Sequence, residues 1–230
     1  MNIIVATNNN DKALELSYLL DIPIEGVKTL KDADIKSYPE ETGSTFLENA
    51  KIKAYAARQY IFDHDMKQFY SWCILADDSG LCVDIINSEP GVYSARYSKR
   101  GNGYTYDKKK TISQNNNEKL LKKLENYDIN KRSAHFETSL VLLRPYNLKN
   151  NNNHHNIRDY KEINIHGICR GFIGFKEEGT NGFGYDPIFF PEKYKGNKTL
   201  AQLSFTEKQT ISHRADAIHK LKNLIKIDDL

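Results

Sequence analysis

Cysteine is scarce in this chain, and its pattern excludes two common ways of stabilising a small fold. The 230 residues contain 3 cysteines, at Cys73, Cys82 and Cys169, and no two of them form a CxxC pair. The sequence therefore signals neither a disulfide framework nor a zinc knuckle. We interpret all three as buried or half-buried thiols.

Long apolar runs and a strong excess of charge are also missing. Residues 1–6 lack the basic start and the apolar stretch of ~7–15 residues that a secretory signal needs, and no window approaches the ~18 apolar residues of a membrane span. Lys and Arg number 33 against 30 Asp and Glu, a net charge of +3. That balance argues against a protein built to neutralise nucleic-acid phosphates. We expect a cytoplasmic protein that binds neither membrane nor nucleic acid.

The N-terminal part alternates between strand and helix patterns. Residues 3–6 are apolar, and after a polar turn the apolar residues over 13–20 recur at helical spacing. Thr45 and Glu48 have the spacing of a capping box and precede a second helical stripe. Residues 72–76 then read as a buried strand that we expect to stop at Asp77 and its polar neighbours, before a period-two pattern resumes.

The rest of the chain continues the alternation. The stretch 104–130 is polar and holds one amphipathic helix, whereas 134–143 and 163–169 are strand candidates that pair most simply with each other. Their connection contains an Asn-rich tract at 147–158, which we interpret as a solvated insertion. A capping-box pattern at 204–207 precedes a helical tail. Strands and helices interleave, so we predict one α/β domain over 1–230 with a central mixed sheet.

Several polar clusters have compositions suited to chemistry, although each has an ordinary structural explanation. The segment Thr7, Asn8, Asn9, Asn10, Asp11 and Lys12 leads from a strand into a helix, where backbone N–H groups and a lysine can receive an anion. Asparagine at a helix start is also usual capping chemistry. The segment is thus either a phosphate-binding loop or a cap.

A pair of carboxylates provides a second candidate site. Asp77 and Asp78 could hold Mg²⁺ or orient and deprotonate a water, or they could simply close a hairpin turn. Glu40 and Glu41 precede the capped helix, and either could supply a further oxygen ligand or be a solvated turn residue. Lys53 could line a site or lie on the surface.

Aromatic and cationic residues near the C-terminus provide a third candidate site. The run of Phe183, Gly184, Tyr185 and Asp186 combines a ring, a flexible backbone and an acceptor, which suits a purine base as well as a turn in the core. A group of donors, suitable for a carbonyl-bearing ligand, precedes the terminal helix at Lys208, His213 and Arg214.

Taken together, the motifs resemble one known family. The segments are Thr7 to Lys12, TGSTFLENAKIKA at 42–54, LADDSGLCVD at 75–84, PGVYSARYS at 90–98, GFGYDPIFFP at 182–191 and ISHR at 211–214. In this order they are similar to the inosine triphosphate pyrophosphatase family, and they run from the first strand to the last helix. The departures are two polar stretches, near 63–71 and 147–158, that look like surface insertions.

The resemblance implies a fold, a reaction and a site. It implies a central mixed sheet flanked by helices, with a second smaller lobe, and Mg²⁺-dependent hydrolysis of ITP, dITP and XTP to the monophosphate and pyrophosphate. It makes Asp78 the water-activating base and a metal ligand, and Ser79 a substrate contact. We take Glu41 as the second metal ligand, although the sequence leaves the choice between Glu40 and Glu41 open. The substrate-binding residues that the resemblance implies are Thr7, Asn8, Asn9, Asn10, Asp11, Lys12, Lys53, Phe183, Gly184, Tyr185, Asp186, Lys208, His213 and Arg214.

Two other functions are compatible with the same motifs. A related pyrophosphatase could act on modified pyrimidine nucleotides, and a nucleotide sensor could bind in the same pocket without turnover. The intact DDSG sequence at 77–80 argues against the sensor. Family resemblance also implies a homodimer, for which an isologous C2 arrangement is the usual solution.

Overall fold

A computed structural model describes residues 1–7, 10–101, 104–146 and 159–228. The predicted loop residues Asn8 and Asn9 and the insertion at 147–158 lie outside these ranges. The chain divides into two compact units. Unit 1 comprises Met1–Asp78, Ser139–His166 and Ala217–Leu230, and unit 2 comprises Ser79–Thr138 and Gly167–Asp216.

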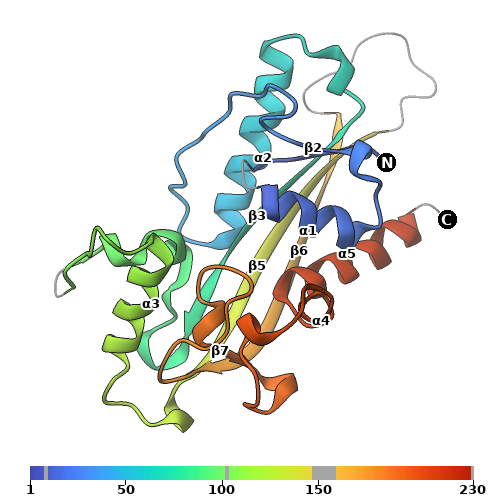
Figure 1. Ribbon diagram of the computed structural model, residues 1–230. Helices are drawn as coiled ribbons and strands as arrows, with labels where there is room; N and C mark the ends of the chain where they lie inside the picture. Colours follow the sequence, from blue (N-terminus) through green and yellow to red (C-terminus); the bar gives the residue numbers. More distant parts are fainter. Residues whose placement is uncertain (8–9, 102–103, 147–158, 229–230) are drawn as a thin grey trace. The chain divides into compact units, whose positions relative to one another are not determined.

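Helices and strands interleave along the chain, as the sequence predicted (Figure 1). The α-helices are α1 (Asn10–Leu20), α2 (Phe46–Asp63), α3 (Ile112–Lys123), α4 (Phe205–Gln209) and α5 (His213–Asp228). The strands are β1 (Ile3–Val5), β2 (Val27–Thr29), β3 (Cys73–Val83), β4 (Glu89–Pro90), β5 (Ser133–Pro145), β6 (Tyr160–Ile173) and β7 (Phe189–Pro191).

Within the described residues the strands form one seven-stranded mixed sheet. Its order is β2-β1-β3-β5-β6-β7, with β4 paired to β3 outside this path. Strand β1 is parallel to β2 and to β3, whereas β4 is antiparallel to β3 and β7 is antiparallel to β6. The predicted α/β class with a mixed sheet is confirmed, and β5 and β6 are neighbours as expected.

In unit 1 both faces of the sheet are covered by helices (Figure 1). The stripe Ala50, Ala54, Ala57 and Ile61 of α2 packs with Ile4, Ile74, Ala76, Val141 and Leu143. On the other face, α1 and α5 pack against Ile3, Val5, Cys73, Leu75, Leu140 and Leu142. Successive side chains of a strand point to opposite faces, so two-sided burial explains why these strands are continuously apolar.

Side-chain caps fix where the helices begin. Thr45 accepts a hydrogen bond from the backbone of Glu48, whose side chain returns one to the backbone of Thr45, and this box starts α2 as predicted. The same device at Ser204 and Glu207 starts α4. The predicted C-terminal tail is two helices, because α4 ends at Gln209 and α5 begins at His213.

Strand β3 differs from the prediction. The sequence indicated a break at Asp77, but β3 runs without interruption from Cys73 to Val83. Both carboxylates are buried, at 2% exposure for Asp77 and 8% for Asp78. They bind side chains of neighbouring helices, so the strand can continue without exposing them to water.

Unit 2 has its own core, formed by one end of the long strands with α3 and the C-terminal loops. Its buried residues include Leu81, Val83, Leu120, Phe136 and Phe189. The helix predicted in the polar middle stretch is α3, which is capped by Thr111. No helix among the described residues has both the length and the hydropathy to cross a membrane.

Candidate active site

The adjacent carboxylates of β3 bind different helices of unit 1. Asp77 shares the α1 side of β3 with Leu75, and its Oδ2 lies 3.0 Å from the ammonium of Lys12 in α1. Asp78 shares the α2 side with Ala76 and binds residues of α2. Alternation along the strand therefore separates two side chains that the sequence presents as a pair.

The Asp78 carboxylate is held by two donors from one face of α2. Asn49 Nδ2 donates to Oδ2 at 3.1 Å, and Lys53 Nζ donates to Oδ1 at 3.0 Å. Residues four apart on a helix point the same way, which is why Asn49 and Lys53 reach the same carboxylate. Lys53 is also 3.3 Å from Glu41 Oε1, so Glu41 joins the cluster.

The orientation of the Asn49 amide is set by the loop before α2. Its Oδ1 accepts a hydrogen bond of 2.8 Å from the backbone N–H of Gly43, which leaves the NH₂ group to face Asp78. A Cβ on Gly43 would lie 2.7 Å from that same Oδ1. Glycine is therefore required here by the close approach of the backbone to Asn49.

Burial and charge perturb this cluster in a direction that suits base chemistry. Burial raises the pKa of the Asp78 carboxyl above 3.8, although the charge and hydrogen bond of Lys53 act against it. Burial alone would lower the pKa of the Lys53 ammonium, but the carboxylates of Asp77, Asp78 and Glu41 outweigh it and raise that pKa. At neutral pH the site thus combines a comparatively basic carboxylate with a protonated lysine.

The carboxylates of this cluster also suit a hard cation. Asp78 and Glu41 supply carboxylate oxygens beside one ammonium group, and oxygen ligands of this kind are those that Mg²⁺ prefers. The structure thus brings Glu41 to Lys53, a contact that bears on the choice between Glu40 and Glu41 that the sequence left open.

A second cluster, in unit 2, surrounds an exposed aromatic ring. The side chain of Phe183 is 44% exposed. Lys208 Nζ lies 4.9 Å from the centre of its ring, and the guanidinium carbon of Arg214 lies 5.7 Å from it. Cations at these distances are attracted to the face of a ring, so the cluster combines a stacking surface with hydrogen-bond donors.

Asp186 fixes the loop that presents Phe183. Its Oδ2 accepts hydrogen bonds from the backbone N–H of Phe183 at 2.9 Å and from Lys208 Nζ at 2.5 Å. Gly182 and Gly184 flank the ring with φ of +76° and +63°. A Cβ on Gly182 would lie 2.1 Å from Asp186 Oδ2, so this turn depends on glycine for both conformation and space.

Ser79 and Arg214 are brought together although 135 positions separate them in sequence. Arg214 Nη2 donates to Ser79 Oγ at 2.8 Å, and both residues belong to unit 2. Arg214 is only 2% exposed. The guanidinium is therefore held in place by the strand that also carries Asp78.

Two predicted base-contacting residues lie in the core of unit 2. Tyr185 is 4% exposed, and its hydroxyl donates to the carbonyl of Ser94 at 2.9 Å. His213 is 5% exposed and stacks on Phe136, with ring centres 5.0 Å apart. These contacts favour structural support for the Phe183 loop and for the start of α5, and the predicted direct contacts of both residues stay predictions.

The predicted phosphate-binding loop is described only in part. Thr7 follows β1, and Asn10 and Asp11 open α1, whose Lys12 binds Asp77. Sequence reasoning had assigned no partner to Lys12, and it had not foreseen that Asn49 binds Asp78. Both contacts join residues far apart in the chain, and no local pattern carries such information.

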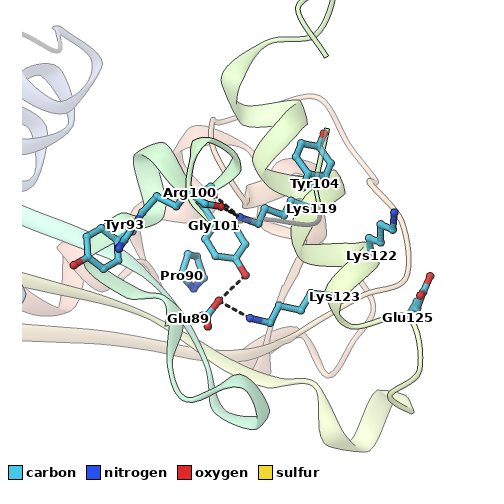
Figure 2. Close-up of a pocket in the computed structure, with 11 residues that line it drawn as sticks. Glu89, Pro90, Tyr93, Arg100, Gly101, Tyr104, Lys119, Lys122, Lys123 and Glu125 are labelled. Atoms are coloured by element: carbon cyan, nitrogen blue, oxygen red, sulfur yellow. Dashed lines mark hydrogen bonds and ion pairs between the residues drawn. The ribbon is translucent and has the colours of Figure 1, made fainter. Parts of the chain in front are cut away.

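A cavity of about 620 Å³ elsewhere in unit 2 gathers cations and tyrosines (Figure 2). Two of its three ammonium groups are already engaged. Lys119 donates to the backbone carbonyls of Tyr97 and Arg100, and Lys123 pairs with Glu89 at 2.7 Å. Among the described residues that line it, none belongs to the predicted site, and we do not assign it the substrate.

Comparison with known proteins places the chain among relatives of similar length. A model of the Ham1 family matches residues 3–224. A Thermoanaerobacter pseudethanolicus protein named dITP/XTP pyrophosphatase is 38% identical over 226 residues, which cover 98% of this chain and 96% of the relative. A Bacillus cereus protein of the same name is 38% identical over 223 residues, which cover 97% of this chain and 94% of the relative.

Solved structures agree with this result. The Staphylococcus aureus Ham1 protein superposes with a TM-score of 0.74 at 34% identity, covering 99% of this chain and 100% of that one. A HAM1 protein from Coxiella burnetii gives a TM-score of 0.73 at 33% identity, with 98% of each chain covered. In both sequence and fold, this chain therefore matches these relatives over almost its whole length.

Proposed function

Because the chain belongs to the Ham1 family, we propose that it hydrolyses the non-canonical purine nucleoside triphosphates ITP, dITP and XTP to the monophosphate and pyrophosphate. The observation that carries this proposal is the nearly full-length similarity to relatives named dITP/XTP pyrophosphatase. The reaction would cleanse the nucleotide pool of deaminated purines before polymerases use them. The protein would then be a hydrolase that acts on acid anhydrides.

Asp78 is proposed as the group that orients and deprotonates the attacking water. A water activated for attack at the α-phosphate needs an acceptor within hydrogen-bond reach, and the raised pKa of Asp78 makes it a stronger acceptor than an exposed aspartate. Asn49 and Lys53 hold the carboxylate in one orientation. Catalysis would therefore rest on positioning and electrostatics, without a covalent nucleophile.

We propose that cations of unit 1 and a bound metal ion neutralise the negative charge of the triphosphate. Lys12, with the loop Thr7 to Asp11, would bind the phosphates, and Lys53 would add a second ammonium. Asp78 and Glu41 would hold Mg²⁺, a choice supported by their oxygen ligands. When bound, the ion would neutralise negative charge on the phosphate oxygens.

The cluster around Phe183 is proposed to recognise the base. The exposed ring would stack on the purine, with Gly184 leaving room beside it, while Lys208 and Arg214 would donate hydrogen bonds and Ser79 would contact the substrate. Donors facing position 6 select the 6-oxo group of hypoxanthine and xanthine, which guanine shares, so GTP would have to be excluded at the purine 2-position. The amino group of adenine would meet those donors with another donor and leave buried groups unpaired.

Chromatography of products tests the proposal directly. Purified protein is incubated with ITP, dITP, XTP, GTP, ATP and UTP in the presence of Mg²⁺ and, separately, of a chelator. IMP and pyrophosphate from ITP, with ATP and GTP largely intact and no product in chelator, would support both reaction and metal. IDP and phosphate would contradict α-phosphate attack. Hydrolysis confined to pyrimidine nucleotides, or tight ITP binding without any product, would replace the proposal with one of the two alternatives.

A homodimer in the cytoplasm is also proposed, by family resemblance. Light scattering coupled to size-exclusion chromatography measures the mass in solution. A mass of twice that of the chain, unchanged on dilution over the range used for kinetics, would support the dimer, whereas the mass of one chain would contradict it.

A further inference from the structure

One group of potential metal ligands in unit 2 has no part in the proposed reaction. Cys82 lies on β3, and His135 and Glu137 lie on β5, which is the neighbour of β3 in the sheet. One ligand atom from each residue lies within 4.8 Å of the other two. His135 and Glu137 are two positions apart on a strand, so both point to the same face.

The distances within this group suit a small metal ion. His135 Nε2 lies 3.7 Å from Glu137 Oε2, which is beyond the limit of a hydrogen bond. Metal–ligand bonds of about 2.0 Å in a tetrahedral site place ligand atoms about 3.3 Å apart. A small rotation of these side chains would therefore bring them to coordination distance.

A second carboxylate supports the histidine from its other side. Asp84 Oδ1 lies 3.7 Å from His135 Nδ1. At this distance no hydrogen bond is formed, and a small side-chain rotation would be needed for Asp84 to accept one from Nδ1 and leave the other nitrogen available, the arrangement usual behind a metal-bound histidine. Here the available atom is Nε2, on the side of Glu137.

The group is also accessible from solvent. His135 and Asp84 line a cavity of about 650 Å³ that also contains Arg170 and Lys195. Cys82 itself is buried, with 4% exposure, whereas the His135 side chain retains 19%. An ion could thus enter at the histidine, and the cavity leaves room for water as a fourth ligand.

We propose that Cys82, His135 and Glu137 form a binding site for a zinc-type divalent metal ion that links β3 to β5. The ligand set selects the metal, because thiolate and imidazole prefer borderline ions such as Zn²⁺ and Co²⁺, whereas Mg²⁺ requires oxygen ligands. The site would therefore be chemically distinct from the Asp78 cluster of unit 1. It does not depend on the proposed hydrolase function.

Cobalt spectroscopy on the untagged full-length chain tests the site without nucleotide or Mg²⁺. The protein is stripped with chelator and titrated with Co²⁺, and Zn²⁺ is then added. We expect near-ultraviolet thiolate-to-cobalt absorption that corresponds to one thiolate-bound Co²⁺ per chain, in addition to any cobalt at the Asp78 carboxylates, and loss of that absorption when Zn²⁺ replaces the cobalt. The thiolate signal distinguishes this site from cobalt bound at His154 and His155, which would give none.

Matched variants identify the ligands. Cys82→Ser should abolish the thiolate absorption, and Cys73→Ser, which changes another buried thiol, should retain it. His135→Asn and Glu137→Gln change half-buried residues and should weaken Co²⁺ binding by about 10-fold or more. Zn²⁺ should raise the Tm of the unaltered protein by more than that of His135→Asn. Circular dichroism establishes that each variant is folded.

Two results would overturn the proposal. One is the absence of thiolate absorption in the folded, unaltered protein at saturating Co²⁺. The other is absorption of equal strength in Cys82→Ser and in the unaltered protein. If Cys82→Ser does not fold, His135→Asn decides the question, because thiolate-to-cobalt absorption of full strength and unchanged Co²⁺ affinity in that variant contradict the site.

Discussion

Asn49 Nδ2 donates a hydrogen bond of 3.1 Å to Asp78 Oδ2, one helical turn before Lys53, which binds the other oxygen of the same carboxylate at 3.0 Å. Both oxygens of Asp78 are thus oriented by α2, whose start is fixed by a capping box. The stability of that helix start and the position of the proposed base are physically linked.

Asp78→Asn should reduce kcat for ITP by about 10²–10⁴-fold, because an amide cannot accept the proton of water. Asparagine has nearly the same shape, so circular dichroism should be unchanged. Asp34→Asn, at an exposed position, is the matched control and should keep full activity. A kcat near that of the unaltered protein would remove Asp78 from the base role.

The same substitution should remove one pH dependence of stability. The folded-state pKa of Asp78 is raised above 3.8, so the folded protein loses stability as pH rises from about 3.8 through that higher pKa. Asparagine does not titrate, and it leaves Asn49 or Lys53 without its acceptor at every pH. The Tm of Asp78→Asn minus that of the unaltered protein should therefore be higher at pH 7 than at pH 4, by about 2–4 °C for each kcal/mol. Thermal melts from pH 8 to pH 4 measure this difference, and a difference that grows in acid would contradict the sign.

Asn49→Asp should move the acidic limb of the kcat/KM profile to higher pH. A second carboxylate next to Asp78 disfavours its ionisation and raises its pKa further. The measurement is kcat/KM for ITP as a function of pH at saturating Mg²⁺. Asn87→Asp introduces the same charge on the surface and should leave the profile in place. An acidic limb at the same pH in both variants would show that Asn49 does not tune Asp78.

Phe183→Ala should raise KM for ITP by about 5–150-fold, corresponding to about 1–3 kcal/mol for a base stacked on an aromatic ring. The change in kcat should be much smaller if the ring serves binding alone. Phe205 is similarly exposed, at 49% against 44%, and Phe205→Ala is the control. Equal KM values for the two variants would exclude a stacking role for Phe183.

Gly182→Ala and Gly184→Ala form a matched pair that tests the turn around Phe183. Both positions have positive φ, which costs about 1–2 kcal/mol for alanine. Only Gly182 also faces Asp186 Oδ2 at 2.1 Å from its hypothetical Cβ, whereas Gly184 faces open space. Chemical denaturation and ITP kinetics should show Gly182→Ala as the more damaging change. Equal effects of the two substitutions would mean that backbone strain alone matters.

The sequence was most informative where a structure depends on neighbouring residues. The capping box at Thr45 and Glu48 and the strand-like composition of 134–143 are local patterns, and both predicted real elements. The break expected at Asp77 was wrong for the same reason. Two consecutive aspartates favour a turn unless distant partners neutralise them, and those partners, Lys12 and Lys53, are provided only by the folded chain.

The sequence allowed a set of site residues to be proposed, but not the contacts among them. Family motifs selected Asp78, Lys53 and Arg214, and the structure adds that Arg214 binds Ser79 and that Asn49 orients Asp78. The group of Cys82, His135 and Glu137 had no sequence signal, because its members come from two strands and follow no ligand-spacing motif.

The alternation of β3 also determines which kinds of genetic change the protein can tolerate. Exchanging one buried aliphatic residue of the strand for another leaves Asp77 toward α1 and Asp78 toward α2. Insertion or deletion of a single codon between Cys73 and Asp77 would shift every later side chain to the opposite face. Such a variant would turn the carboxylates toward the wrong lysines, so β3 should vary in composition among functional variants while keeping a fixed length.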